Sequence, residues 1–113
     1  MAKLSPYETG ELTNSIFFIL MVTTKPIHGY GIMKIVQEAT EQSVDIGPAT
    51  MYTTLKKLKK AGWISEVGEE DSKILYKITN AGQKILHENF EQRKRIVYFA
   101  KKYMEGLNNG EKL

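Results

Sequence analysis

Residues 48–62 read Pro48-Ala-Thr-Met-Tyr-Thr-Thr-Leu-Lys-Lys-Leu-Lys-Lys-Ala-Gly62 and carry the pattern of a single amphipathic helix. Pro48 suits the first turn, where its missing N–H has no helical partner, and Gly62 suits the position just beyond the end. The pattern therefore predicts a helix over about residues 48–61 with one face in a core. The apolar side chains recur at the three- and four-residue spacing of one helical face: Met51, Leu55 and Leu58.

The other face of this helix is polar and basic. Four lysines and no acidic residue lie between Gly47 and Gly62, which gives the segment a local charge of +4. Such a helix fits the major groove of DNA, because hydroxyl groups can meet base edges or phosphates and lysines neutralise the backbone. A solvated helix with a lysine-rich face is the alternative interpretation. The polar face comprises Thr50, Tyr52, Thr53, Lys56, Lys57 and Lys60.

Length and composition limit the size of the fold and the kinds of site that the chain can contain. The chain has 113 residues, of which 42% are hydrophobic, and this is enough for one domain with a modest core. Because the net charge is only +3, the clustering of charge has to support any argument for nucleic-acid binding. The absence of cysteine excludes disulfides and thiolate zinc sites. His28 and His87 lie far apart in the sequence, so we expect no metal and no cofactor.

Signals for a membrane, for secretion and for catalysis are missing from the sequence. The longest apolar run, residues 16–22, is far shorter than the roughly 20 residues of a membrane-spanning helix. No Ser/His/Asp constellation, glycine-rich phosphate loop or pair of acids suggests an active site. We therefore expect a cytoplasmic protein that has no membrane partner and is not an enzyme.

The segment before Pro26 predicts a loose arm over residues 1–7 and then a first helix from about Glu8 to Thr24. Its run of residues 16–22 is apolar on all sides, so both faces must be covered. We expect one face to pack inside the domain and the other against another long helix or a second subunit. Pro26 ends the helix, because the residue before a proline disfavours helical backbone.

A second helix is predicted over about Gly29–Thr40, followed by a short connection over residues 42–47. Two glycines at its start cost helix stability, which suggests close backbone packing there. Two helices with apolar inner faces joined by a short turn form a helix-turn-helix, in which the second helix enters the groove.

The hydrophobic period changes after Gly62 and predicts a β-hairpin. Residues 63–67 and 74–78 are rich in β-branched and aromatic side chains, and residues 68–73 between them resemble a polar loop. A hairpin directly after a groove-reading helix is the wing of a winged helix. Trp63 begins this hairpin and is expected in the core.

Thr79-Asn80 is expected to cap a final helix that runs to about Leu107. At 1.5 Å per residue it would reach about 40 Å, longer than a domain of this size can bury. An exposed apolar stripe of this kind usually marks a partner interface, and we expect a homodimer. A helix folded back on its own domain is the alternative. The stripe consists of Leu86, Phe90, Arg93, Val97, Ala100, Met104 and Leu107, broadened by Ile96, Phe99 and Tyr103.

Several motifs, in this order and spacing, resemble the PadR family of bacterial transcriptional regulators over about residues 10–105. The resemblance implies a winged helix-turn-helix, a C-terminal dimerisation helix and repression by binding a two-fold operator. It also implies that Thr50 and Tyr52 face DNA and that Lys56 and Lys57 contact phosphates. The motifs are His28-Gly-Tyr-Gly-Ile32, Pro48-Ala-Thr-Met-Tyr52, Leu55-Lys-Lys-Leu58, Gly62-Trp-Ile64 and Tyr76-Lys-Ile-Thr-Asn-Ala-Gly82.

The sequence departs from this family pattern in two places. Many relatives carry arginines that lead into the second wing strand, whereas residues 65–73 here carry four acids and one lysine, so wing contact should be limited to Lys73 and Lys77. Some relatives sandwich flat aromatic compounds between tryptophans at the dimer centre, and that region has no tryptophan here. A small aromatic effector would instead meet Phe18, Phe90, Tyr98 and Phe99.

The sequence as a whole predicts a mainly α fold with a small β-hairpin: a winged helix-turn-helix over residues 1–79, a dimerisation helix over 80–107 and a flexible tail over 108–113.

The expected partners are double-stranded DNA and a second copy of the chain, and a protein-interaction module without specific DNA binding is the competing function. Tyr30 is interpreted as a packing or phosphate-contacting residue. The expected DNA-binding residues are Tyr30, Ala49, Thr50, Tyr52, Thr53, Lys56, Lys57, Lys73 and Lys77. The expected dimerisation residues are Phe17, Leu86, Phe90, Arg93, Val97, Ala100, Met104 and Leu107.

Overall fold

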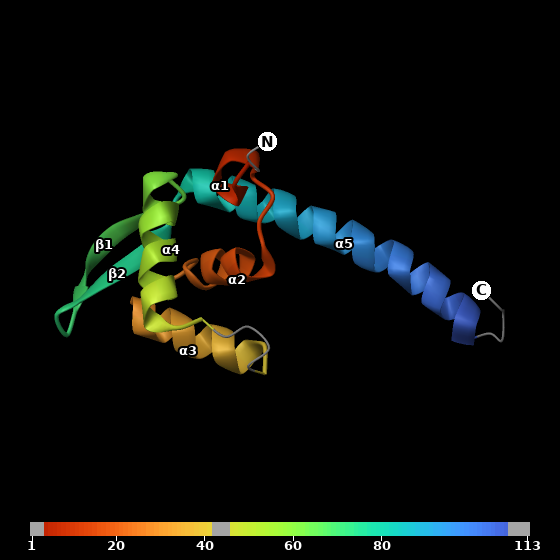
Figure 1. Cartoon of the computed structure of the whole chain (residues 1–113), viewed down its shortest axis with the longest axis horizontal. Coiled ribbons are helices and arrows are strands. Elements are labelled where there is room, and N and C mark those ends of the chain that lie inside the picture. Colours follow the sequence, from red (N-terminus) through yellow and green to blue (C-terminus); the bar gives the residue numbers. More distant parts are fainter. Residues whose placement is uncertain (1–3, 42–45, 109–113) are drawn as a thin grey trace.

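The computed structural model describes residues 4–41 and 46–108, which form a helical domain with one hairpin and a long C-terminal helix (Figure 1). Helices α2 to α4 and the hairpin make up a winged helix-turn-helix, which confirms the predicted fold class. Among the described residues, none of the helices has the length and hydropathy of a membrane span. The elements are α1 (Pro6–Thr9), α2 (Asn14–Val22), α3 (Gly29–Ala39), α4 (Pro48–Lys60), β1 (Ile64–Glu70), β2 (Lys73–Ile78) and α5 (Asn80–Asn108).

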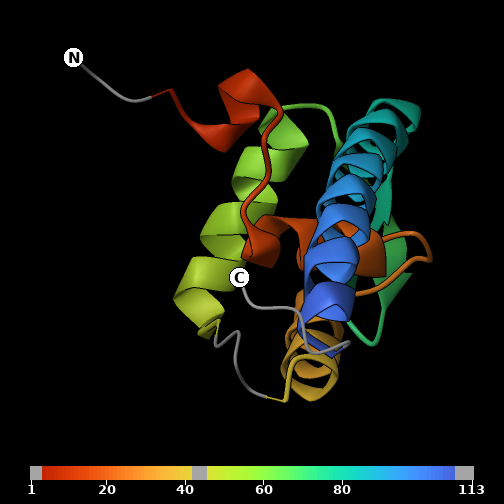
Figure 2. The same cartoon turned by 90° about the vertical axis from the view of Figure 1, so that its right-hand side faces the viewer.

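The core lies where α2, α3 and α4 meet the base of the hairpin. Seen from the side toward which α5 projects, α2 crosses between α4 and α5 (Figure 2). Trp63 is buried, as predicted, and its ring stacks on Tyr7 with centroids 5.7 Å apart. The predicted inner stripe of α4 is fully buried. The most deeply buried apolar side chains are Ile19, Leu20, Ile32, Val36, Met51, Leu55, Leu58 and Ile64.

The prediction of one helix from Glu8 to Thr24 is wrong, because the chain breaks into α1 and α2. Gly10 adopts a left-handed backbone with φ of 76°, which ends α1. The Thr13 hydroxyl then accepts a hydrogen bond from the Ile16 N–H at 3.2 Å and starts α2. Residues 6 and 7 belong to α1, so the predicted arm is also too long; its first three residues lie outside the described part of the chain.

The hairpin is longer than predicted, and residues 68–73 are not a loop. Glu69 pairs with Ile74 and Glu70 with Lys73, so only Asp71 and Ser72 form the turn. Both turn residues have positive φ, 52° and 63°, which is the backbone of a tight two-residue hairpin turn. A bulge between residues 66 and 68 shifts the register of β1. Glu66, Glu69 and Glu70 therefore lie along β1, and Asp71 lies in the turn.

The C-terminal helix makes the molecule elongated. Helix α5 has 29 residues, so it is about 43 Å long, and its second half projects beyond the domain (Figure 1). The radius of gyration is 16.8 Å, whereas a compact chain of this length would have about 13 Å. The Thr79 hydroxyl accepts from the Gly82 N–H at 3.1 Å and caps α5, as predicted. Of the predicted connection and tail, residues 42–45 and 109–113 lie outside the described residues.

Candidate nucleic-acid interface

The outer face of α4 is open to solvent along its whole length. Met51, Leu55 and Leu58 hold the opposite face in the core, so the residues between them must point outward. Three lysines lie in the last turn, where they favour the negative end of the helix dipole. The exposed residues include all the positions on α4 that were predicted to bind DNA: Ala49, Thr50, Tyr52, Thr53, Lys56 and Lys57.

The start of α3 lies against the start of α4 at this surface. The His28 Nδ1 atom accepts a hydrogen bond from the Gly31 N–H at 3.1 Å, so His28 caps α3. Tyr30 follows on the exposed side, and the Lys73 ammonium group of the wing lies 5.5 Å from the centre of its ring. Tyr52 of α4 contacts Gly29 of α3. Three elements that are separate in the sequence thus form one surface.

Two shallow hollows flank Tyr52 on this surface. One is about 230 Å³ and lies between Tyr52, the start of α3 and the wing; the other is about 210 Å³ and lies between α4 and the wing. Tyr76 lines both hollows. Burial raises the pKa of the Tyr76 hydroxyl, and the nearby charge of Glu66 raises it further, so this group stays protonated at neutral pH. The hollows therefore place the protonated Tyr76 hydroxyl near lysine side chains.

The wing carries its charge unevenly around this surface. Glu69, Glu70 and Asp71 are exposed near the tip, and Glu66 at the base pairs with Lys59 of α4 at 3.4 Å. Lys77 lies between two buried residues of β2 and so faces away from the core. The structure thus brings Lys73 together with Tyr30 and leaves Lys77 on the outer face of the hairpin. The Lys59–Glu66 pair was not predicted, because the sequence does not indicate which acid lies near α4.

A second exposed surface runs along α5. In the first half of the helix, Gly82 and Asn89 are buried against the domain. The helix then continues past the domain, where no other described part of the chain covers it (Figure 1). Phe90 is 51% exposed, Val97 65% and Met104 60%. Ala100 and Leu107 are also exposed, and Leu86 is partly buried against the core.

Two of the expected dimerisation residues, Phe17 and Arg93, also contact each other within the chain. The Arg93 guanidinium lies 4.2 Å from the centre of the Phe17 ring, donates to the Leu12 carbonyl at 3.0 Å and donates to Asn14 Oδ1 at 2.9 Å. Arg93 thus faces the segment before α2 of its own chain. Asn89 reinforces this contact between α5 and the segment before α2.

Asn89 was missed by the sequence reasoning. Its Oδ1 atom accepts from the Leu12 N–H at 3.0 Å, and its Nδ2 atom donates to the Gly10 and Ile85 carbonyls at 2.8 and 2.9 Å. We call the contact of Asn89 and Arg93 with residues 10–14 the α5 clasp. The one signal in the sequence was an asparagine on the domain-facing side of a long helix.

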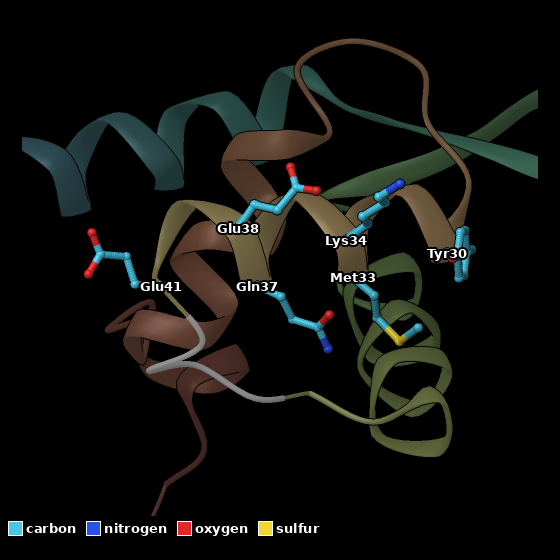
Figure 3. Close-up of a pocket in the computed structure, with 6 residues that line it drawn as sticks. All are labelled: Tyr30, Met33, Lys34, Gln37, Glu38 and Glu41. Carbon is cyan, nitrogen blue, oxygen red and sulfur yellow. The ribbon is translucent and has the colours of Figure 1, made fainter.

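The expected ligand residues are not gathered within one chain. Phe18 packs beside the core, Phe90 lines a hollow of about 230 Å³ with Met21, and Tyr98 contacts Phe99 edge to face at 5.4 Å farther along α5. A larger hollow of about 630 Å³ lies along α3, and Lys34 and Glu38 point to one side while Met33 and Gln37 point to the other (Figure 3). None of the expected ligand residues lines it.

Comparisons with known proteins agree on one family. Residues 19–88 match the model described as the transcriptional regulator PadR-like family. A transcriptional regulator from Clostridium thermocellum superposes with a TM-score of 0.66 at 24% identity and covers 79% of this chain and 88% of its own. A PadR family transcriptional regulator from Eggerthella lenta gives 0.65 at 20% identity, covering 80% of each chain.

One further solved structure contains DNA. Bacillus subtilis PadR in complex with operator DNA is 27% identical, with a TM-score of 0.58, over 68% of this chain and 46% of that chain. A comparison with curated proteins gave no match. The similar region includes the surface formed by α3, α4 and the wing, since the family match spans residues 19–88.

Proposed function

This chain belongs to the PadR-like family of transcriptional regulators, and we propose that it acts as a repressor that binds a two-fold DNA operator as a homodimer. The exposed face of α4 is the observation that carries the proposal. Hydroxyl groups on its first turns and lysines on its later turns suit contacts to base edges and to phosphates respectively. The 27% identical Bacillus subtilis PadR was solved with operator DNA, which supports the same partner.

In this proposal each part of the surface has a distinct task. Thr50, Tyr52 and Thr53 meet base edges, with Ala49 close enough to the groove floor to allow their approach. Lys56, Lys57 and Lys73 neutralise phosphates, and Tyr30 meets the backbone beside Lys73. Lys77, exposed on the outer side of the hairpin, is the second lysine of the wing that contacts phosphates.

The dimer sets the geometry of binding. Residues 1–79 bind DNA, and residues 80–107 pair with those of a second copy through the exposed stripe of α5. Two α4 helices related by a two-fold axis then enter adjacent major grooves about 34 Å apart. An aromatic effector that altered the angle between the α5 helices would change this distance and release the operator. A thermal-shift screen of planar aromatic compounds tests this release by an effector. A compound that raises the melting temperature should also lower the affinity of the protein for its operator.

Selection from random duplex DNA by the purified protein, followed by footprinting of the enriched sequence, tests the proposed function. We expect two inverted half-sites whose centres lie about one helical turn apart. Failure to enrich any sequence would reject specific DNA binding, and a single unpaired site would reject the two-fold arrangement.

A protein-interaction module is the second candidate, and the acidic wing favours it. Glu69, Glu70 and Asp71 are exposed and would be repelled by phosphates at low salt. This candidate predicts that the selection enriches no sequence and that α4 variants leave any DNA affinity unchanged.

A further inference from the structure

The ring of Tyr52 rests on a glycine of the preceding helix. A Cβ atom built on Gly29 would lie 3.0 Å from Tyr52 Cε1, 3.2 Å from Cζ and 3.3 Å from the hydroxyl oxygen. These distances are shorter than ordinary contacts, so a side chain on residue 29 would push the ring away by a few tenths of an ångström. Gly29 therefore fixes how closely the outer half of the Tyr52 ring approaches α3.

The backbone of Gly29 gives no other reason for glycine. It is the first residue of α3, and the described glycines with positive φ are Gly10, Gly62 and Gly68. Alanine is a better helix former than glycine at such a position. Glycine therefore lowers the stability of α3 at this position, but it leaves space for the Tyr52 ring.

The Tyr52 ring has room to move when it is pushed. It is 55% exposed, and a hollow lies on each side of it, one toward the wing and one toward Lys56 and Lys59. A methyl group on residue 29 would thus shift the ring into one of these spaces and leave the core as it is. The Tyr52 hydroxyl would then be displaced by a few tenths of an ångström from the position that it has beside glycine.

We propose that Gly29 is a positioning residue that sets the Tyr52 ring for base reading. The inference rests on the proposed function, because it assigns to Gly29 the aim of a side chain that contacts DNA. A glycine on one helix of the helix-turn-helix thereby controls the specificity of the other.

The test compares wild type, Gly29→Ala, Tyr52→Ala and the double variant by fluorescence anisotropy on the operator selected by the wild type. Gly29→Ala should melt at or slightly above the wild-type temperature and bind the operator about tenfold more weakly, the size of one lost base contact. In the Tyr52→Ala background the same change should cause no further loss, because the displaced ring is gone.

Gly31→Ala is the matched control. Its added Cβ would also lie 3.0 Å from a side chain, but that side chain is Ile27; His28 Cε1 is at the ordinary contact distance of 3.4 Å, and Tyr52 is not among the three nearest atoms. It should therefore leave the sequence preference of the protein unchanged, whereas Gly29→Ala should alter the bases selected opposite Tyr52.

Wild-type affinity for Gly29→Ala, or a loss that persists in the Tyr52→Ala background, would overturn the inference. If the Gly29→Ala single variant does not fold but the double variant with Tyr52→Ala does, the added methyl group conflicts with the Tyr52 ring, which supports the inference. If neither variant folds, the inference is overturned. A wild type that enriches no DNA would instead reject the proposed function itself, so the two failures are distinguishable.

Discussion

Replacing Asn89 by alanine tests the α5 clasp. Asn89 is 3% exposed, and its side chain bonds the Leu12 N–H and the Gly10 carbonyl, both in the segment that joins α1 to α2. Alanine leaves the buried Leu12 N–H and the partly buried Gly10 carbonyl without these partners. Since an unsatisfied buried polar group costs about 1–3 kcal/mol, we expect a loss of about 2–4 kcal/mol in the free energy of unfolding.

The measurement is urea unfolding at one fixed protein concentration, because association of two chains would add to apparent stability. Lys94→Ala is the control on the same helix. Its side chain is 65% exposed and its contact with Glu91 is 3.8 Å long, so it should change stability by less than about 0.5 kcal/mol. An Asn89→Ala protein as stable as this control would refute the argument that the clasp fastens α5 to the domain.

Three other features of the molecule give further expected outcomes. Gly82→Ala should destabilise the fold by about 1–3 kcal/mol in urea unfolding, because its methyl would collide with the backbone that enters β1; equal stability would contradict that close approach. Val97→Glu with Met104→Glu places charges on the exposed stripe of α5, so it should halve the mass measured by light scattering and leave the helical circular dichroism unchanged. A retained dimer would exclude this face of α5 as the dimer interface. Glu69→Lys with Glu70→Lys should raise operator affinity at low salt, and an unchanged affinity would place the wing tip away from DNA.

The sequence predicted α4 and the fold class because the signals there are local. Met51, Leu55 and Leu58 repeat with the helical period, and the same period decides which face is buried. The change of period after Gly62 likewise indicated the hairpin. The structure and the family match confirm the winged helix-turn-helix that these patterns predicted.

The errors arose where a strong pattern hid a weaker one. The apolar run of α2 suggested one long helix, although Gly10 and Thr13 are ordinary signals for the end of one helix and the start of the next. Glu69 and Glu70 have the composition of a loop, yet they pair across the hairpin because the two-residue turn sets the register. The amino-acid composition of these residues does not determine the register in which the two strands pair.

The residues that organise the site were hardest to predict, because their partners are distant in the sequence. Asn89 accepts a hydrogen bond from a backbone group 77 residues away, and Gly29 lies against the ring of Tyr52 on the next helix. Arg93 falls on the apolar stripe of α5, and it also contacts its own domain. No periodicity in the sequence indicates that an arginine on such a stripe makes this contact.

The salt dependence of operator binding tests most directly whether α4 binds DNA. Lys56→Gln with Lys57→Gln removes four charges from a dimer, so the slope of log affinity against log salt should become shallower by about 3.6. Lys94→Gln with Lys101→Gln removes the same charge from exposed sites on α5 and should leave the slope unchanged. A slope that is equal in wild type and in the α4 variant would contradict the assignment of this helix to DNA.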